Sequence, residues 1–216
     1  MDMDPNTYIV IIATLYGLIS LFAGIAVHEL GHFLAARFLG IEVSGVSVGF
    51  GPEIVGFTDR YGVRWKLAPL PVGGACSFRE RPGGKGDREN KLRTLREASL
   101  ADRAIVLVCG PASNLCFAGL IWLIIFFHTS ILPFMPEEEA VFGLPAFLLQ
   151  LSCAIAFFNL LPIPPLDGGY LVLIAFEKLR GRAVSNEKQM IRAGAWVIAV
   201  VTIVTSVLLF ARIVSL

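Results

Sequence analysis

Charged residues are scarce in this sequence. Lys, Arg, Asp and Glu make up 16% of its 216 residues, whereas an ordinary soluble domain contains about a quarter. Hydrophobic residues make up 56%, and four apolar runs contain no charged side chain at all: residues 8–27, 104–127, 140–161 and 193–211. Because about 20 helical residues cross a bilayer core, the sequence predicts an α-helical polytopic membrane protein with four transmembrane helices.

Cysteine pairs are also missing. The sequence has four cysteines and no Cys-x-x-Cys pattern, which argues against a zinc ribbon or a disulfide framework. Three of the cysteines lie in apolar runs and the fourth lies in the first basic segment: Cys109, Cys116, Cys153 and Cys76. We expect buried free thiols.

Positive charge is absent from one of the connecting segments, and this predicts the topology. Twelve Lys and Arg residues lie within 37–103 and five within 178–192, whereas 128–143 has none and carries three Glu residues at 137–139. Basic loops face the cytoplasm, so we expect a single domain over 1–216 with both termini outside. The start of the chain has no basic region and no small-residue cleavage site, so we expect the first run to be a retained helix.

The segment 41–78 changes character, because short β-branched and aromatic stretches replace the apolar runs. We expect strands and hairpins here, with strands near 43–48 and 63–67 and breaks at 49–52 and 69–74. Residues 79–103 mix both signs of charge, which predicts a cytoplasmic loop leading to a short surface helix. That helix would carry Leu92, Leu95 and Leu100. Mixed signs without interleaved aromatics argue against nucleic-acid binding.

The sharpest chemical signal is His28-Glu29-Leu30-Gly31-His32, near the end of the first predicted helix. We expect this helix to run to Phe38 or Leu39, because Gly40 is a typical helix C-cap. Positions i and i+4 share a helix face, so His28 and His32 can bind one Zn²⁺ while Glu29 acts on a metal-bound water. Ionisable groups within a membrane are costly and mark functional sites, although these three could also be interfacial residues that reach for water.

A catalytic zinc takes three protein ligands, so a third is expected. Asp167 is the only acidic residue between Glu139 and Glu177, and it follows three prolines within 159–169. These prolines must break the third helix, and irregular backbone within a membrane is tolerated where it lines a cavity. The sequence therefore predicts Asp167 in that cavity. The alternative is an ordinary Asp-Gly turn that caps the next helix.

Several motifs together resemble the site-2 proteases, a family of intramembrane zinc metalloproteases. They are the His-Glu-Leu-Gly-His motif, Gly-Pro-Ala-Ser-Asn at 110–114, and Asn159 through Leu-Asp-Gly-Gly at 166–169. The strand-rich segment 70–74 and Gly49-Phe-Gly51 also look like the family's membrane-associated β-segment, which is thought to hold substrate as an added strand.

The resemblance implies roles for individual residues. It implies zinc ligation by His28, His32 and Asp167, and a catalytic base at Glu29. It also suggests substrate contacts at four further positions: Asn114, Asn159, Gly73 and Gly74. Either asparagine could instead bond a neighbouring helix. We expect no role for His128, an interfacial residue.

The predicted function is hydrolysis of peptide bonds within single-span membrane proteins, with the fragment released to the cytoplasm. Compactness and family likeness suggest a bacterial cytoplasmic membrane. Bacterial members usually carry a PDZ domain that is absent between the second and third predicted helices here, and an accessory protein could replace it. Two alternatives remain. One is a metalloprotease with a Glu third ligand, at Glu97 or Glu177, and the other is a zinc transporter or sensor without proteolytic activity.

Overall fold

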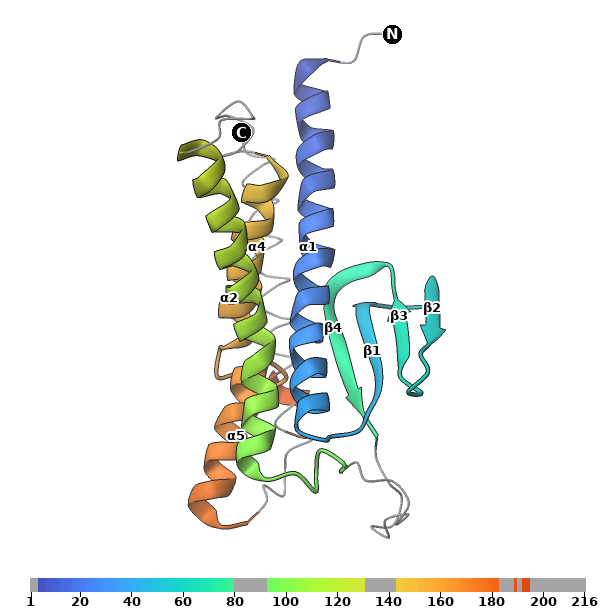
Figure 1. Cartoon of the computed structure of the whole chain (residues 1–216), viewed down its shortest axis with the longest axis vertical. Coiled ribbons are helices and arrows are strands. Elements are labelled where there is room, and N and C mark those ends of the chain that lie inside the picture. The colour runs from blue at the N-terminus through green and yellow to red at the C-terminus, as the bar shows by residue number, and fades with distance from the viewer. Residues whose placement is uncertain (1–3, 80–92, 131–142, 183–188, 190–191, 195–216) are drawn as a thin grey trace. The chain divides into compact units, whose positions relative to one another are not determined.

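The computed structural model describes residues 4–79, 93–130, 143–182, 189 and 192–194. The chain divides into two compact units, residues 1–158 and 159–216. The first unit holds α1 (Pro5–Phe38), the four strands β1 (Val43–Phe50), β2 (Val55–Thr58), β3 (Arg64–Leu67) and β4 (Leu70–Phe78), then α2 (Leu100–Ser130) and α4 (Leu144–Asn159, whose last residue belongs to the second unit) (Figure 1). The second unit holds α5 (Asp167–Arg180).

The first helix, α1, begins and ends where local chemistry stops the helical pattern. The Asp4 side chain caps its N-terminus by accepting from the Thr7 N–H, and Pro at the first helical position loses no hydrogen bond. At the other end Leu39 is the C-cap and Gly40 has φ +70°, a conformation that suits glycine. The predicted end at Phe38 or Leu39 is confirmed.

Helices α1 and α2 pack closely beside the motif. A Cβ on Gly31 would collide with the Cys109 carbonyl and with the Ser113 side chain. The Ser113 hydroxyl donates to the Val27 carbonyl at 2.8 Å. The absence of a side chain at Gly31 therefore lets the two helices approach at the level of the histidines.

The segment before α2 differs from the prediction. Leu92 lies outside the described residues, Leu95 lies in a turn, and Leu100 is already the first residue of α2. The turn is closed by Thr94 and Glu97, since the Thr94 N–H donates to the Glu97 carboxylate at 2.7 Å. The predicted short surface helix is therefore wrong for Leu95 and Leu100, because Leu95 lies in this turn and Leu100 opens the long helix α2.

The strands form one sheet in the order β2-β3-β1-β4. β1 pairs antiparallel with β4 but parallel with β3, which forms a hairpin with β2. The predicted strands at 43–48 and 63–67 fall on β1 and β3. The predicted break at 49–52 begins inside β1, and the one at 69–74 is wrong from Leu70 onward, because β4 runs through it, in agreement with the strand-rich character that the resemblance implies. β4 is an edge strand with a register shift opposite Val48–Phe50, and edges and bulges tolerate proline and glycine.

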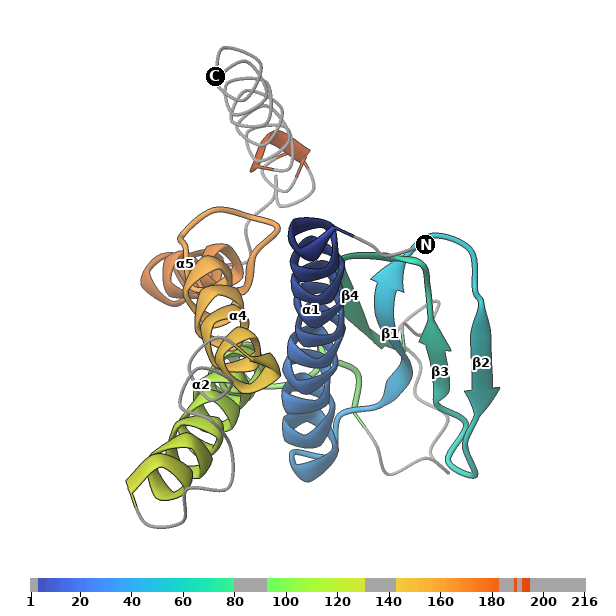
Figure 2. The ribbon, with the colours of Figure 1, turned by 90° about the horizontal axis from the view of Figure 1, so that it is seen from above.

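The sheet packs against one side of α1, while α2 and α4 lie on the other side (Figure 2). Under the sheet is a core of small and branched side chains: Ala36, Ile41, Val43, Val46, Val63, Ala98 and Val106. On the other side Tyr16 of α1 meets Phe147 of α4 edge-on, with ring centroids 6.2 Å apart. α1 is thus packed on two sides, by the sheet near its C-terminal end and by α4 at Tyr16.

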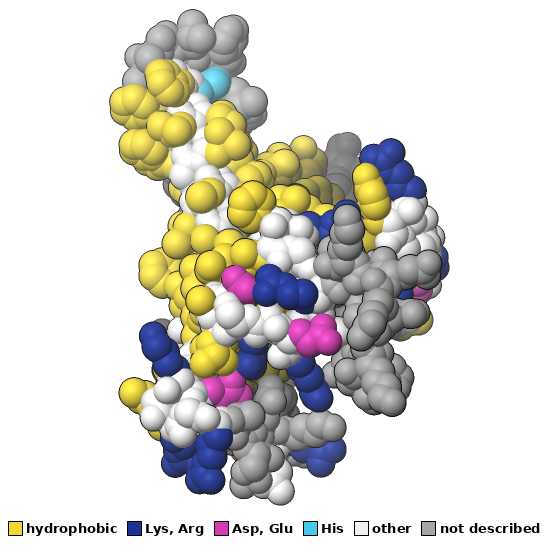
Figure 3. Space-filling model, turned by 60° about the horizontal axis from the view of Figure 1, so that its bottom comes forward, with side chains coloured by type: hydrophobic (Ala, Val, Ile, Leu, Met, Phe, Trp, Pro, Cys, Tyr) yellow, Lys and Arg dark blue, Asp and Glu magenta, His cyan; other side chains and the backbone are white. Residues whose placement is uncertain are grey.

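In the part of the chain that the structure describes, two helices are long and apolar enough to cross a membrane, over Thr7–Phe38 and Leu100–His128. Large hydrophobic side chains on them are exposed, among them Val10, Leu120 and Trp122. Figure 3 shows hydrophobic side chains gathered over part of the surface, apart from the Lys and Arg side chains. These features support a membrane location.

The full count of four spans remains a prediction. α4 has 16 residues, and at about 1.5 Å per residue it is shorter than a bilayer core about 30 Å thick. The predicted third span, 140–161, begins outside the described residues, and most of the fourth, 193–211, lies outside them.

In the second unit, a closed turn leads into α5. Its Leu166 N–H bonds the Ile163 carbonyl at 3.0 Å, which closes a turn just before the helix. A Cβ on Gly168 or Gly169 would collide with the backbone at Leu160 or Pro164. The proline-rich turn therefore folds back against the start of α5, and Asp167 is the first residue of that helix.

Candidate metal centre

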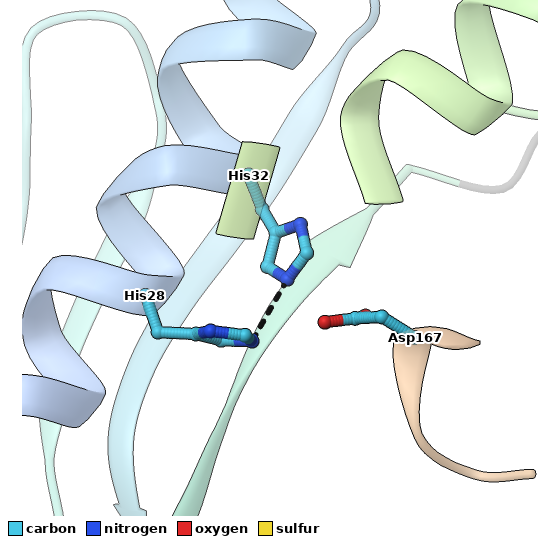
Figure 4. Close-up of side chains that lie close together, drawn as sticks. All are labelled: His28, His32 and Asp167. Carbon is cyan, nitrogen blue, oxygen red and sulfur yellow. Dashed lines mark hydrogen bonds between the residues drawn. The ribbon is translucent and has the colours of Figure 1, made fainter. Parts of the chain in front are cut away.

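Three side chains of the motif are buried on the last turns of α1. His28, Glu29 and His32 are 6%, 5% and 7% exposed. The Nε2 atoms of His28 and His32 lie 3.1 Å apart, and the two rings meet edge-on (Figure 4). Two nitrogens bound to one tetrahedral zinc at about 2.0–2.1 Å would stand about 3.3–3.4 Å apart. The separation therefore suits two ligands of one ion.

The other nitrogen of His32 has a defined partner. Its Nδ1 lies 2.8 Å from the Val106 carbonyl oxygen on α2. A carbonyl only accepts, so Nδ1 carries the proton and Nε2 keeps its lone pair. Metal-binding histidines commonly make this second hydrogen bond, which fixes both the tautomer and the ring orientation. His32 is therefore prepared to bind a metal through Nε2.

Gly110 of α2 makes room for both imidazoles. A Cβ at this position would collide with the His32 ring and would stand 3.0 Å from Cε1 of His28. Even an alanine would need the rings to move. The residues around the two histidines thus form a cradle that fits the imidazole pair.

Glu29 lies against the edge strand β4. A Cβ added to Gly74 would meet both Cγ and Oε1 of Glu29 at 2.7 Å. Gly74 pairs with Val48 of β1, so the sheet brings the backbone of β4 to the carboxylate. Gly73, the other predicted substrate contact on this strand, lies against the Phe50 ring instead.

All four cysteines are free thiols, as expected, but the expected burial is wrong for Cys116, which is exposed, and only partial for the other three. Cys76 lies on β4, two residues beyond Gly74. Burial, with a smaller contribution from the charge of Glu29, raises the pKa of the Cys76 thiol to about 12. A thiol with that pKa is protonated at neutral pH and is a poor metal ligand.

Asp167 contributes a carboxylate from the start of α5. Among the described residues, one group of three His, Cys, Asp or Glu side chains could hold a metal ion, namely His28, His32 and Asp167. Their ligand atoms lie within 4.8 Å of one another (Figure 4). Two imidazoles and one carboxylate match the donor set of catalytic zinc sites.

The two predicted asparagines lie in different surroundings. Asn114 of α2 is fully buried, with its Nδ2 3.4 Å from Nδ1 of His28. Asn159 is the last residue of α4 and is half-buried. The substrate contacts predicted for both residues remain predictions.

The sequence reasoning missed the contributions of Val106 and Gly110. A signal was available, because 106, 110 and 114 follow one another at intervals of four and so share a face of α2. That face touches both histidines. Finding it required the pairing of α1 with α2, which periodicity alone does not supply.

Among the described residues, two apolar helices could cross a membrane and one of them carries this His-Glu-x-x-His group, a combination typical of the membrane metallopeptidases. The family model of peptidase family M50 matches residues 16–134 and 137–204. The chain belongs to this family, which confirms the resemblance to the site-2 proteases.

Curated relatives match over about half of the chain. A protein of Agrobacterium fabrum named "Putative zinc metalloprotease" is 41% identical over 110 residues, which cover 46% of this chain and 29% of that protein. A protein of Haemophilus influenzae named "Regulator of sigma E protease" is 33% identical over 104 residues, covering 48% of this chain and 24% of that protein. The matched stretch thus spans less than a third of either relative.

A solved structure is also similar. The site-2 protease from Methanocaldococcus jannaschii matches with a TM-score of 0.42 and 21% identity, over 74% of this chain and 53% of that chain.

Proposed function

We propose that this chain is a zinc metalloprotease that hydrolyses peptide bonds within or near the transmembrane segments of other proteins. The observation that carries the proposal is the buried histidine pair, whose Nε2 atoms lie 3.1 Å apart while Val106 holds His32 in the ligating tautomer. His28, His32 and Asp167 would hold the zinc. When bound, zinc polarises the scissile carbonyl and lowers the pKa of water toward about 7. The naming of the relatives as zinc metalloproteases supports the same metal.

Glu29 is the proposed general base. Its carboxylate accepts a proton as water attacks the carbonyl carbon of the scissile bond. When the C–N bond breaks, the same group returns the proton to the leaving amine nitrogen. Its position next to His28 in sequence and against Gly74 of β4 puts it between the proposed ligands and a strand.

β4 is the proposed docking strand for substrate, with contacts at Gly73 and Gly74. Helical carbonyls are bonded within the helix, so a transmembrane substrate must unwind before it is cut. A new strand on the edge of a sheet offers partners to the freed amides. β4 is one of the two edge strands of the described sheet, and its Gly74 lies against Glu29. Asn159 is proposed to contact the substrate or its developing oxyanion.

Strand addition can be tested on the substrate, which leaves the enzyme intact. Successive N–H groups of a strand point to opposite sides. N-methyl groups placed on alternate amides near the scissile bond should therefore block cleavage in one register and spare it in the other. Equal cleavage of both substrates in quantitative gel assays would contradict docking on β4.

The proposed location is a bacterial cytoplasmic membrane with both termini outside, the metal centre toward the cytoplasm and the product released there. The clustering of Lys and Arg in 37–103 and 178–192 supports this orientation. An accessory protein is proposed to take the place of a PDZ domain in recruiting a single-span substrate.

The deciding experiment compares wild type with Glu29→Gln on a model single-span substrate in detergent, with bound zinc counted in both. The variant keeps the shape of the side chain but cannot take a proton. We expect it to retain zinc and to lose at least about 100-fold in cleavage rate, a usual contribution of general acid–base catalysis. Full activity in the variant would remove Glu29 from the mechanism. Zinc binding without cleavage by the wild type would favour a metal-handling role.

A further inference from the structure

Asn114 makes a contact with the metal centre that the proposed reaction does not yet use. Its side chain is 0% exposed and lies on the face of α2 that meets α1. One end of its amide, Nδ2, stands 3.4 Å from Nδ1 of His28. The other end, Oδ1, is buried without a hydrogen-bond partner among the described residues. Burying an acceptor without a partner is unfavourable, so this orientation of the amide leaves Oδ1 unsatisfied.

The protonation of His28 decides which end of the amide is useful. A histidine that binds metal through Nε2 carries its proton on Nδ1 and needs an acceptor there. Nδ2 can only donate, so it cannot serve this tautomer. A half-turn of the amide about its Cβ–Cγ bond exchanges the two ends and turns Oδ1 toward Nδ1, and the nitrogen and oxygen of an amide are nearly the same size.

We propose that Asn114 is a positioning residue for His28, with its Oδ1 accepting the Nδ1–H in the zinc-bound protein. This inference rests on the proposed role of His28 as a zinc ligand. The bond also gives Oδ1 the partner that it lacks. The two histidines are then held in the same way from one face of α2, His32 by the Val106 carbonyl and His28 by the Asn114 side chain.

The hydrogen-bond acceptors of the two histidines differ in kind, because one is a backbone carbonyl and the other is a side chain. A backbone carbonyl is present whatever residue stands at 106, whereas the acceptor for His28 depends on the side chain at 114. The proposal therefore predicts that α2 can lose the support of His28, but not that of His32, by a single substitution.

The first test measures zinc affinity by competition with a chromophoric chelator in purified full-length protein. Asn114→Leu keeps the size but removes both polar atoms, and we expect affinity to fall about 10- to 100-fold, the usual effect of losing an outer hydrogen-bond partner. Asn114→Asp keeps an acceptor and removes the donor, so it should stay within about threefold of wild type, far less than that loss. An aspartate variant as weak as the leucine variant, or a leucine variant with wild-type affinity, would overturn the proposal.

Two controls separate this role from general damage. Ser152→Ala removes another fully buried polar group, on α4, and should leave zinc affinity unchanged. His28→Ala tests the assignment on which the inference rests. If His28→Ala keeps its zinc, the ligand assignment itself fails. If it loses zinc while Asn114→Leu does not, only the role of Asn114 fails.

The second test reads the hydrogen bond directly and does not depend on how the leucine variant folds. The chain has three histidines, so ¹⁵N-histidine spectra of the zinc-loaded protein are simple to assign with His28→Ala. We expect a slowly exchanging Nδ1–H on His28 in wild type and in Asn114→Asp. Zinc bound through Nδ1 of His28, or an Nδ1–H that exchanges too fast to observe in wild type, would overturn the proposal.

Discussion

The two halves of α1 have the same apolar character but different surroundings. In the first half large side chains are exposed, such as Tyr8 at 56% and Val10 at 63%. In the second half one face is buried by α2 and by the sheet, and His28 is only 6% exposed. Ionisable groups are expensive within a membrane unless protein surrounds them. One continuous apolar helix can therefore expose large side chains in its first half and line the candidate metal centre in its second half.

The largest effect should come from removing a proposed ligand. His32→Ala takes away one nitrogen of the pair, and we expect zinc affinity to fall by more than about 100-fold, since losing an outer partner alone costs about 10- to 100-fold. Val10→Ala, in the exposed half of the same helix, should leave it unchanged. Zinc content after dialysis of the detergent-purified proteins measures both. A variant at 32 with full affinity would break the distinction between the two halves.

The next largest effect compares two glycines of α2, one against the histidine rings and one in open space. Gly110→Ala adds a Cβ that collides with the His32 ring, whereas Gly119→Ala meets nothing within 4 Å. We expect the change at 110 to lower zinc affinity and to destabilise the protein by about 1–3 kcal/mol, the usual cost of overpacking. The change at 119 should be neutral or slightly stabilising, because alanine is the better helix former.

Thermal unfolding of the two glycine variants in detergent, with zinc titration beside it, tests this prediction. If both variants behave alike, Gly110 is not needed as a cradle for the imidazoles.

The smallest effect concerns Cys76 of β4, whose thiol pKa is affected by the charge of Glu29 on α1. Its pKa of about 12 is raised mainly by burial and then by the charge of Glu29. At pH 8 the thiol is therefore protonated, and iodoacetamide should alkylate it far more slowly than an unfolded chain. Glu29→Gln removes one of the two causes, which lowers the pKa and should raise the alkylation rate modestly.

Peptide mass mapping of the alkylated protein isolates the contribution of Cys76 from those of the other cysteines. Alkylation of folded wild type at pH 8 as fast as in urea would show that the thiol is neither buried nor affected by Glu29.

Much of the candidate site could be predicted from local spacing. The interval of four between His28 and His32 puts both on one helix face, and Gly40 marks the end of that helix correctly. The failures lie where the surroundings override local signals. Pro71, Gly73 and Gly74 are typical of a break, but an edge strand accommodates them.

The sequence alone determined the properties that repeat over a few residues: the apolar runs, the helix-face pairing of the histidines, and the position of an isolated acidic residue after a proline-rich turn. Only the tertiary structure decided which groups surround the histidines. The Val106 carbonyl and the Asn114 amide reach them across 74 and 86 residues of chain. It also decided that β1 pairs in parallel with β3. Such contacts depend on which helix and strand faces pack together, and helical or strand periodicity carries no information about that choice.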